Sequence, residues 1–109
     1  MNVPKHTGAQ ALLHSLAGSG VRVCFANPGT SEMHLVAALD SVPEIRSILC
    51  LFEGVVSGAA DGYGRIAGKP AMTLLHLGSG LSNAAANLHN AKRAHTPIVN
   101  IVGDHARYH

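Results

Sequence analysis

Two residues of this 109-residue chain combine reactive side chains with positions suited to moving protons, Glu53 and His76. Each directly follows a largely apolar run, 48–52 for the acid and 71–75 for the histidine. A carboxylate at the end of a buried run is poorly solvated, which raises its affinity for a proton, and histidine exchanges protons near neutral pH. From position alone both also have structural interpretations. An acid favours a helix start, and a histidine more commonly bonds a neighbouring carbonyl.

Other kinds of site receive less support. The Gly-Ser-Gly segment at 78–80 reads as a turn that could cradle a phosphate at the next helix start, but it lacks the GxGxxG pattern and the Walker lysine. Cys24 and Cys50 lie inside apolar runs without CxxC spacing, so we expect two inert buried thiols. Six further histidines show no paired ligand spacing, and we expect no metal site among them: His6, His14, His34, His89, His95 and His109. Four cations are expected to be solvated charges near helix ends: Arg65, Lys69, Lys92 and Arg93.

Alternating strands and helices are expected to position these residues. Apolar runs predict four buried strands, at 21–26, 48–52, 71–76 and 98–102. Helical spacing and capping signals predict four helices, at 7–17, 31–42, 53–67 and 82–94. This alternation is typical of a three-layer α/β fold, a parallel sheet with helices on both faces. Ligands of such sheets bind beside the carboxyl ends of the strands, so the polar residues that follow each strand should lie at one edge.

Composition limits the class of protein. The net charge is only +2, which gives no argument for a nucleic-acid partner. Hydrophobic residues make up 47% and charged residues 13%, which excludes disorder by composition and suggests apolar surface meant for a partner. We expect no membrane span, since no apolar run approaches ~18 residues. The absence of a signal-peptide layout and of a disulfide framework predicts a reducing cytoplasm.

A set of short motifs is more specific in combination than any one of them alone. The first is Phe52–Gly54 followed by Ala59–Pro70, and the others are Gly20–Phe25, Asn27–Glu32, Leu75-His76 with Gly80 and Asn83, Thr96–Val99 and Gly103-Asp104. Together they resemble the N-terminal pyrimidine-binding (PYR) domain of thiamine diphosphate-dependent enzymes, with acetolactate synthase and benzoylformate decarboxylase as close relatives. The resemblance covers essentially the whole chain.

The resemblance implies roles for individual residues. Glu53 matches a glutamate that bonds a ring nitrogen of the cofactor's aminopyrimidine and favours its imino tautomer, which removes the proton from the thiazolium carbon. His76 matches a decarboxylase histidine that faces the substrate and moves protons. Thr30 matches a serine that contacts the substrate carboxylate. Four further residues are implied to shape the pyrimidine pocket and the loop beside it: Pro28, Gly29, Gly80 and Asn83.

The resemblance also implies what lies outside these residues. Residues 1–109 match the N-terminal part of a PYR domain, whereas the central domain and the C-terminal diphosphate-binding domain are absent. That C-terminal domain carries the Gly-Asp-Gly motif and the later asparagine that hold magnesium and the diphosphate. We therefore expect thiamine diphosphate as cofactor, a 2-oxo acid as substrate, and a homodimer or homotetramer completed by further domains or a partner subunit. This chain alone is expected to be inactive.

Three alternatives stay open at this point. The segments Asn27–Gly29 and Leu75-His76 favour a simple decarboxylase slightly over an acetolactate synthase. A PYR-like module could also have lost catalysis and kept only dimerisation, through its glycine-rich and alanine-rich helices. The third alternative is a nucleotide-binding α/β domain that uses the segment 78–80.

Overall fold

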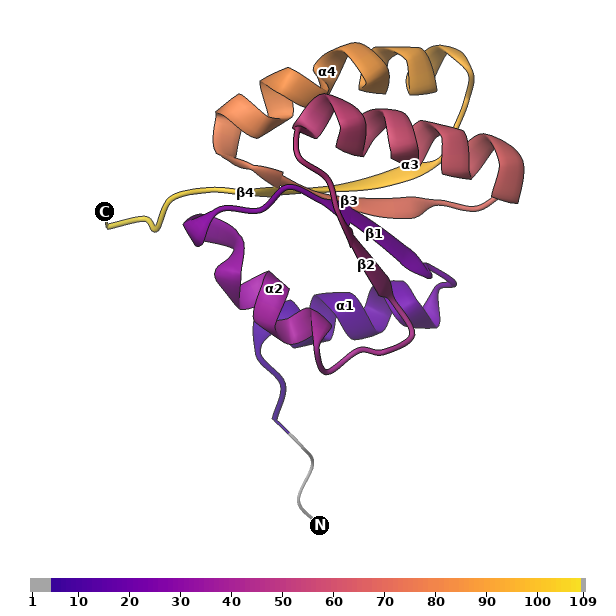
Figure 1. The fold of residues 1–109 in the computed structure, drawn as a ribbon. Coiled ribbons are helices and arrows are strands. Elements are labelled where there is room, and N and C mark those ends of the chain that lie inside the picture. The colour runs from indigo at the N-terminus through magenta and orange to yellow at the C-terminus, as the bar shows by residue number, and fades with distance from the viewer. Residues whose placement is uncertain (1–4, 109) are drawn as a thin grey trace.

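Residues 5–108, which the computed structural model describes, form a parallel sheet between two layers of helices (Figure 1). The strands are β1 (Val23–Ala26), β2 (Arg46–Leu49), β3 (Ala71–His76) and β4 (Ile98–Gly103). The helices are α1 (Gly8–Gly18), the short 3-10 turn η1 (Thr30–Glu32), α2 (Met33–Leu39), α3 (Glu53–Ala67) and α4 (Leu77–Arg93). The predicted three-layer α/β fold is confirmed. None of these helices is long and apolar enough to cross a bilayer.

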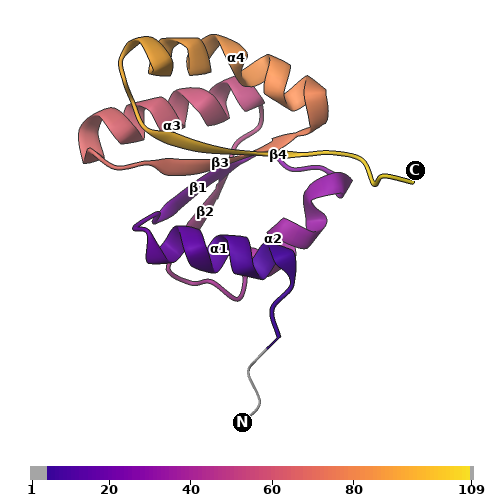
Figure 2. The same ribbon diagram turned by 180° about the vertical axis from the view of Figure 1, so that it is seen from behind.

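The order of the strands places a crevice at one edge of the sheet. The order is β2-β1-β3-β4, and every neighbouring pair is parallel. Helices α1 and α2 cover one face and α3 and α4 cover the other (Figures 1 and 2). The chain therefore leaves the carboxyl end of β1 through α2 on one face to reach β2, and leaves the carboxyl end of β3 through α4 on the other face to reach β4. Connections that diverge in this way open a crevice beyond the carboxyl ends of β1 and β3, where ligands of such sheets bind.

The central strand β3 anchors the core because both of its faces are covered. Its first five residues, 71–75, are completely buried. On the α1 and α2 face, Leu13 and Leu39 belong to the larger apolar cluster with Leu74. On the α3 and α4 face, Val56 and Leu75 belong to a smaller cluster. A strand held on both faces gives the residues at its carboxyl end a rigid support.

Helix α1 begins with the capping box that the sequence predicts. The Thr7 hydroxyl accepts a hydrogen bond from the Gln10 backbone N–H at 3.2 Å. In return, the Gln10 side chain accepts one from the Thr7 backbone N–H at 3.0 Å. Each bond satisfies a backbone group that the helix itself cannot, which typically stabilises a helix by about 1 kcal/mol.

Four predictions about where strands and helices begin or end are wrong. Strand β2 covers 46–49 rather than 48–52, and Leu51 beyond it is 88% exposed, so the apolar run continues past the sheet. Strand β1 begins at Val23 rather than at 21. The segment 78–80 is helical and does not form the predicted loop: it lies at the start of α4. The helix predicted to begin at Ser31 begins at Met33, because Ser31 lies inside η1. Apolar runs mark burial or partner surface, and they do not mark strand ends.

Two glycines of α3, Gly58 and Gly64, allow close packing against residues that follow α3 in the chain. A Cβ at Gly64 would lie 2.5 Å from the Thr96 side chain and 3.0 Å from the Pro97 carbonyl oxygen. A Cβ at Gly58 would lie 3.1 Å from the Asn87 side chain of α4. At Gly62 nothing lies within 4 Å, so close approach does not explain that glycine. Each glycine destabilises the helix by about 1 kcal/mol relative to alanine. At Gly58 and Gly64 the missing side chain allows close contact with Asn87, Thr96 and Pro97.

Arg65 is not the free solvated charge that the sequence suggests. Its guanidinium donates two hydrogen bonds to the carboxylate of Asp61, one turn earlier in α3, at 2.9 Å each. The Arg65 guanidinium lowers the pKa of Asp61 through these bonds. This pair stabilises the helix surface, and neither residue belongs to the strand ends where the polar site residues gather.

Both cysteines are buried, as predicted. Burial raises the pKa of the Cys24 thiol to about 12, above its ordinary value of 9.0. Burial also raises the pKa of Cys50. Because the thiolate is the reactive form of cysteine, both side chains should be inert packing groups.

Alkaline pH should therefore weaken the fold through Cys24. Between pH 9.0 and about 12 the unfolded chain loses the thiol proton while the folded chain keeps it, so the free energy of unfolding falls as pH rises. The slope from this group approaches about 1.4 kcal/mol per pH unit. Urea unfolding at several alkaline pH values measures it, with Cys24→Ala as the comparison. An equally steep fall in that variant would contradict the assignment to Cys24.

Candidate functional site

Glu53 lies at the first position of α3, where the chain passes from β2 onto the face of the sheet that α3 and α4 cover (Figure 1). Its side chain is only 6% exposed. Its Oε1 atom accepts a hydrogen bond from the Asn27 side-chain amide, 3.0 Å away in the loop after β1. The contact joins segments 26 residues apart in the sequence. It fixes the carboxylate beside the crevice between β1 and β3.

The first turn of α4 packs directly on the Glu53 carboxylate. A Cβ at Gly80 would lie 2.7 Å from Glu53 Oε2, so only glycine leaves this oxygen in its place. The Asn87 side chain donates a hydrogen bond to the Gly54 carbonyl at 2.8 Å, which ties α4 to the start of α3. Helix α4 therefore helps to define where the carboxylate lies.

His76 ends β3 and contacts a second acid that is completely buried. Its Nδ1 atom lies 2.8 Å from Oε1 of Glu32, whose side chain has no exposed surface. The His76 side chain itself is 32% exposed. The same Glu32 oxygen also accepts the Gly29 backbone N–H at 2.8 Å. The two contacts join the loop after β1 to the end of β3.

Two glycines make room for this pair. A Cβ at Gly29 would lie 2.5 Å from the His76 ring, and a Cβ at Gly103, the last residue of β4, would lie 2.0 Å from Glu32 Oε2. Neither position tolerates a larger residue without moving the side chain beside it. The backbone thus encloses the pair from two sides.

The residue after His76 has an unusual backbone conformation. Leu77 has a φ of 55°, in the left-handed region that residues other than glycine rarely adopt. Such a conformation costs of order 1 kcal/mol or more and tends to occur at functional sites. Here it lets α4 begin immediately after β3, which brings Gly80 onto Glu53.

An open groove of about 500 Å³ extends from His76 across the carboxyl ends of the strands. Its lining residues come from η1, α2, the start of α4 and the segment after β4: Thr30, Ser31, His34, His76, Leu77, Asp104, His105 and Ala106. Three imidazoles, two hydroxyls and a single carboxylate give it a polar surface. The hydroxyls can donate or accept hydrogen bonds to a polar ligand in this groove. No group of three or more His, Cys, Asp or Glu residues within 5–108 is arranged to hold a metal ion.

Most of the residues predicted for the site lie close to Glu53 or to His76, and two of them, Pro28 and Asn83, lie elsewhere. Glu53 contacts Gly80, while His76 contacts Gly29 and shares the groove with Thr30. Pro28 instead lines a second groove of about 190 Å³, between α2 and the carboxyl end of β2. Asn83 is exposed on α4.

Two residues of the site have no individual prediction from the sequence, Asn27 and Glu32. Both lie in the motif that follows β1. The signal that could have found Glu32 is its spacing. An acid three residues after Gly29 can accept the backbone N–H at a helix start, and the structure contains that bond.

A comparison with protein families decides what this geometry belongs to. The model of the thiamine pyrophosphate enzyme, N-terminal TPP binding domain, matches residues 6–109. The chain belongs to this family. The resemblance to a pyrimidine-binding domain is thereby confirmed, and Glu53, His76 and the groove lie within the matched region of a TPP-enzyme domain.

Relatives of the TPP-enzyme domain span both enzyme types. The chain is 70% identical over 94% of its length to IlvX of Mycobacterium tuberculosis, named as an acetolactate synthase large subunit. It is 38% identical over 81% of its length to benzoylformate decarboxylase of Pseudomonas aeruginosa. The chain spans only about 20% of the first relative and 16% of the second.

Solved structures agree with the TPP-enzyme fold. The Rhodococcus jostii thiamine diphosphate-dependent 4-hydroxybenzoylformate decarboxylase matches 94% of this chain with a TM-score of 0.84 and 30% identity, and the match covers 19% of that protein. Benzoylformate decarboxylase of Polynucleobacter necessarius matches 92% with a TM-score of 0.83 and 28% identity, again over 19% of its length.

Proposed function

We propose that this chain is the cofactor-activating N-terminal domain of a thiamine diphosphate-dependent 2-oxo-acid decarboxylase or acetolactate synthase-like enzyme, in which Glu53 activates the aminopyrimidine. The observation that carries the proposal is the Glu53 carboxylate. It is buried, held by Asn27 through one oxygen and covered by Gly80 at the other. A carboxylate fixed in this way can share a proton with a weakly basic ring nitrogen.

The residues present fit the pyrimidine end of thiamine diphosphate. A weakly basic ring needs a carboxylate partner, and Glu53 supplies one at the first position of α3, bonded to Asn27 in the loop after β1. When bound, the cofactor supplies an electron sink for the carbanion that decarboxylation leaves. Glu53 holds the proton at its carboxylate, and Asn27 keeps Oε1 from rotating away.

The groove beside His76 is the proposed position of the 2-oxo acid. The Thr30 hydroxyl can donate a hydrogen bond to the substrate carboxylate, and His76 can exchange a proton with the reacting carbonyl. Both residues line the groove: Thr30 lies in η1, which follows β1, and His76 is the last residue of β3. Compared with a serine, threonine adds a methyl group at this wall, which narrows the space for the substrate.

The rest of the enzyme is proposed to lie outside this chain. The diphosphate and magnesium would be held by a C-terminal domain, since residues 1–109 correspond to the N-terminal part of a PYR domain. The complete enzyme would be a cytoplasmic homodimer or homotetramer in which the cofactor lies between the PYR domain of one subunit and the diphosphate domain of another. This chain alone would be inactive.

Release of carbon dioxide tests the proposal. The complete protein is incubated with thiamine diphosphate, magnesium and either pyruvate or benzoylformate, and carbon dioxide and acetolactate are measured. Cofactor-dependent carbon dioxide from benzoylformate indicates a simple decarboxylase, and acetolactate from pyruvate indicates a synthase. Failure to release carbon dioxide from any 2-oxo acid, together with calorimetric binding of a dinucleotide in place of thiamine diphosphate, would contradict the proposal.

A second candidate function is a dimerisation module without catalysis. It is favoured by exposed apolar side chains between the end of β2 and the start of α3, where Leu49 is 70% exposed, Leu51 88% and Val55 54%. Such a surface on a domain of this size suits a protein partner. Sedimentation of the chain discriminates, because a monomer at all concentrations would count against a dimer face.

A further inference from the structure

Glu32 is the one completely buried acid within residues 5–108. Both contacts of its carboxylate are made by one oxygen. Oε1 receives the Gly29 backbone N–H at 2.8 Å and faces His76 Nδ1 at 2.8 Å. Oε2 is buried without a hydrogen-bond partner and lies against Gly103. A buried acid with an unsatisfied oxygen is costly, which indicates that its position serves a purpose beyond stability.

The geometry fixes which ring nitrogen of His76 carries hydrogen. A backbone N–H can only donate, so Glu32 Oε1 acts as an acceptor in its bond with Gly29. A carboxylate oxygen that already accepts a hydrogen bond is best matched at its second contact by another donor. An ionised Glu32 can only accept hydrogen bonds, so the 2.8 Å contact then requires a hydrogen on His76 Nδ1, in the neutral ring as well as in the charged one. The nitrogen that gains and loses a proton is then Nε2.

The surroundings hold this arrangement in place. Glu32 has no exposed surface and cannot swing into solvent. The Gly29 backbone packs against the His76 ring, where a Cβ would come within 2.5 Å. His76 also lines the groove proposed for the 2-oxo acid. One side of the ring is thus engaged by a buried acid while the residue borders the groove.

We propose that Glu32 is a positioning residue for His76. It accepts the Nδ1 hydrogen, fixes the tautomer and orientation of the ring, and leaves Nε2 as the atom that exchanges a proton with the substrate. This inference deepens the proposed function and rests on it. Glu32 has no contact with the substrate in this arrangement and acts only through the imidazole.

The first test reads the tautomer without any substrate. The complete protein is labelled with 15N-histidine, and the ring nitrogens of His76 are assigned by their loss in His76→Gln. At a pH where the ring is neutral, the shifts should show a protonated Nδ1 and a bare Nε2. A neutral ring with its proton on Nε2 would overturn the inference, whatever the activity.

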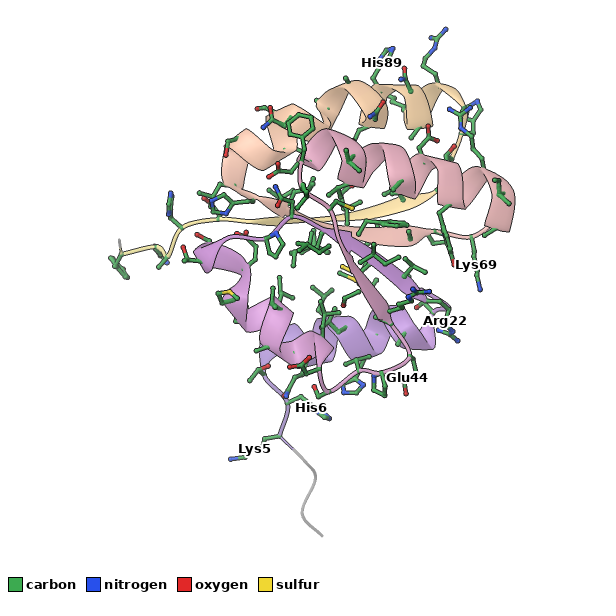
Figure 3. All side chains as sticks on the ribbon, viewed as in Figure 1. Lys5, His6, Arg22, Glu44, Lys69 and His89 are labelled. Carbon is green, nitrogen blue, oxygen red and sulfur yellow. The ribbon has the colours of Figure 1, made fainter. Side chains whose placement is uncertain are left out.

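Two variants separate positioning from simple support of the fold. Glu32→Gln keeps an oxygen that can accept the Nδ1 hydrogen, so the tautomer should persist. Glu32→Leu removes the acceptor, so the Nε2-protonated form should appear and kcat should fall roughly 10- to 100-fold with KM within about threefold. Glu44→Gln is the matched control, because Glu44 precedes β2 at the opposite end of the sheet (Figure 3). In Glu44→Gln, the His76 tautomer and kcat should both match those of the wild type.

The outcomes distinguish this inference from the proposed function. If His76→Gln leaves kcat unchanged, the catalytic role of His76 fails and the inference falls with it. If His76→Gln lowers kcat but Glu32→Leu keeps both the tautomer and kcat of the wild type, the inference alone fails. Should Glu32→Leu not fold, the tautomer of the wild-type protein still decides, since that measurement needs no substitution at Glu32.

Discussion

Replacing Glu53 by glutamine is expected to lower cofactor-dependent decarboxylation by the complete protein roughly 100-fold or more. Glutamine has nearly the same shape, and its amide oxygen can still accept the Asn27 bond that Oε1 receives at 3.0 Å. The variant should therefore fold. It cannot share a proton with a ring nitrogen as a carboxylate does, which is the step that the proposed function assigns to Glu53. Turnover at saturating thiamine diphosphate measures the effect.

The matched control for this variant is Glu44→Gln. It makes the same chemical change in an exposed residue of the loop before β2, far from the crevice (Figure 3). Turnover of the control should equal that of the wild type. If Glu53→Gln also turned over at the wild-type rate, Glu53 would have no part in cofactor activation, and the proposed function would lose the observation that carries it.

Gly80→Ala is expected to lower turnover roughly 10- to 100-fold while thermal stability changes little. Its new Cβ would lie 2.7 Å from Glu53 Oε2, so the carboxylate must move. That movement costs the fold little, because the atom in the way ends a flexible side chain. Alanine also favours a helix over glycine by about 1 kcal/mol. A displacement of this size at an activating group is enough to impair catalysis.

Gly78→Ala is the paired control, in the same first turn of α4. A Cβ at Gly78 would meet nothing within 4 Å. This variant should keep wild-type turnover and should unfold at an equal or slightly higher temperature. Equal turnover in both alanine variants would show that the contact between Gly80 and Glu53 does not matter for activity. Equal losses in both would point to the helix start itself rather than to the carboxylate.

The sequence predicts β3 well, where both faces of the strand are covered, and predicts β2 poorly, at one edge of the sheet. Strand β3 occupies 71–76 as expected. Its residues are buried on both faces of the sheet, so the apolar run and the strand coincide. At β2 the apolar run 48–52 misleads, since Leu51 is exposed outside the sheet. Apolar residues there lie on the exposed surface. Hydrophobicity alone does not separate these two causes.

The candidate site is predictable where single residues carry the signal. Glu53 and His76 stand out because each reactive side chain directly follows a largely apolar run, 48–52 or 71–75. No role is predicted for Glu32 from the sequence, because its contact with the site is a bond to His76, 44 positions away. The same holds for Asn27, which reaches Glu53 across 26 positions. Such pairings depend on the strand order, which composition and periodicity do not specify.

Exchange of the thiazolium proton of bound thiamine diphosphate tests the proposed role of Glu53 most directly. The complete protein is loaded with thiamine diphosphate and magnesium, mixed with deuterium oxide and quenched at short times, and the remaining proton is measured by NMR. No substrate is needed, so the measurement isolates activation of the cofactor from every later step. The proposed function predicts exchange roughly 100-fold or more slower in Glu53→Gln than in the wild type. Equal exchange rates in the two proteins would contradict it.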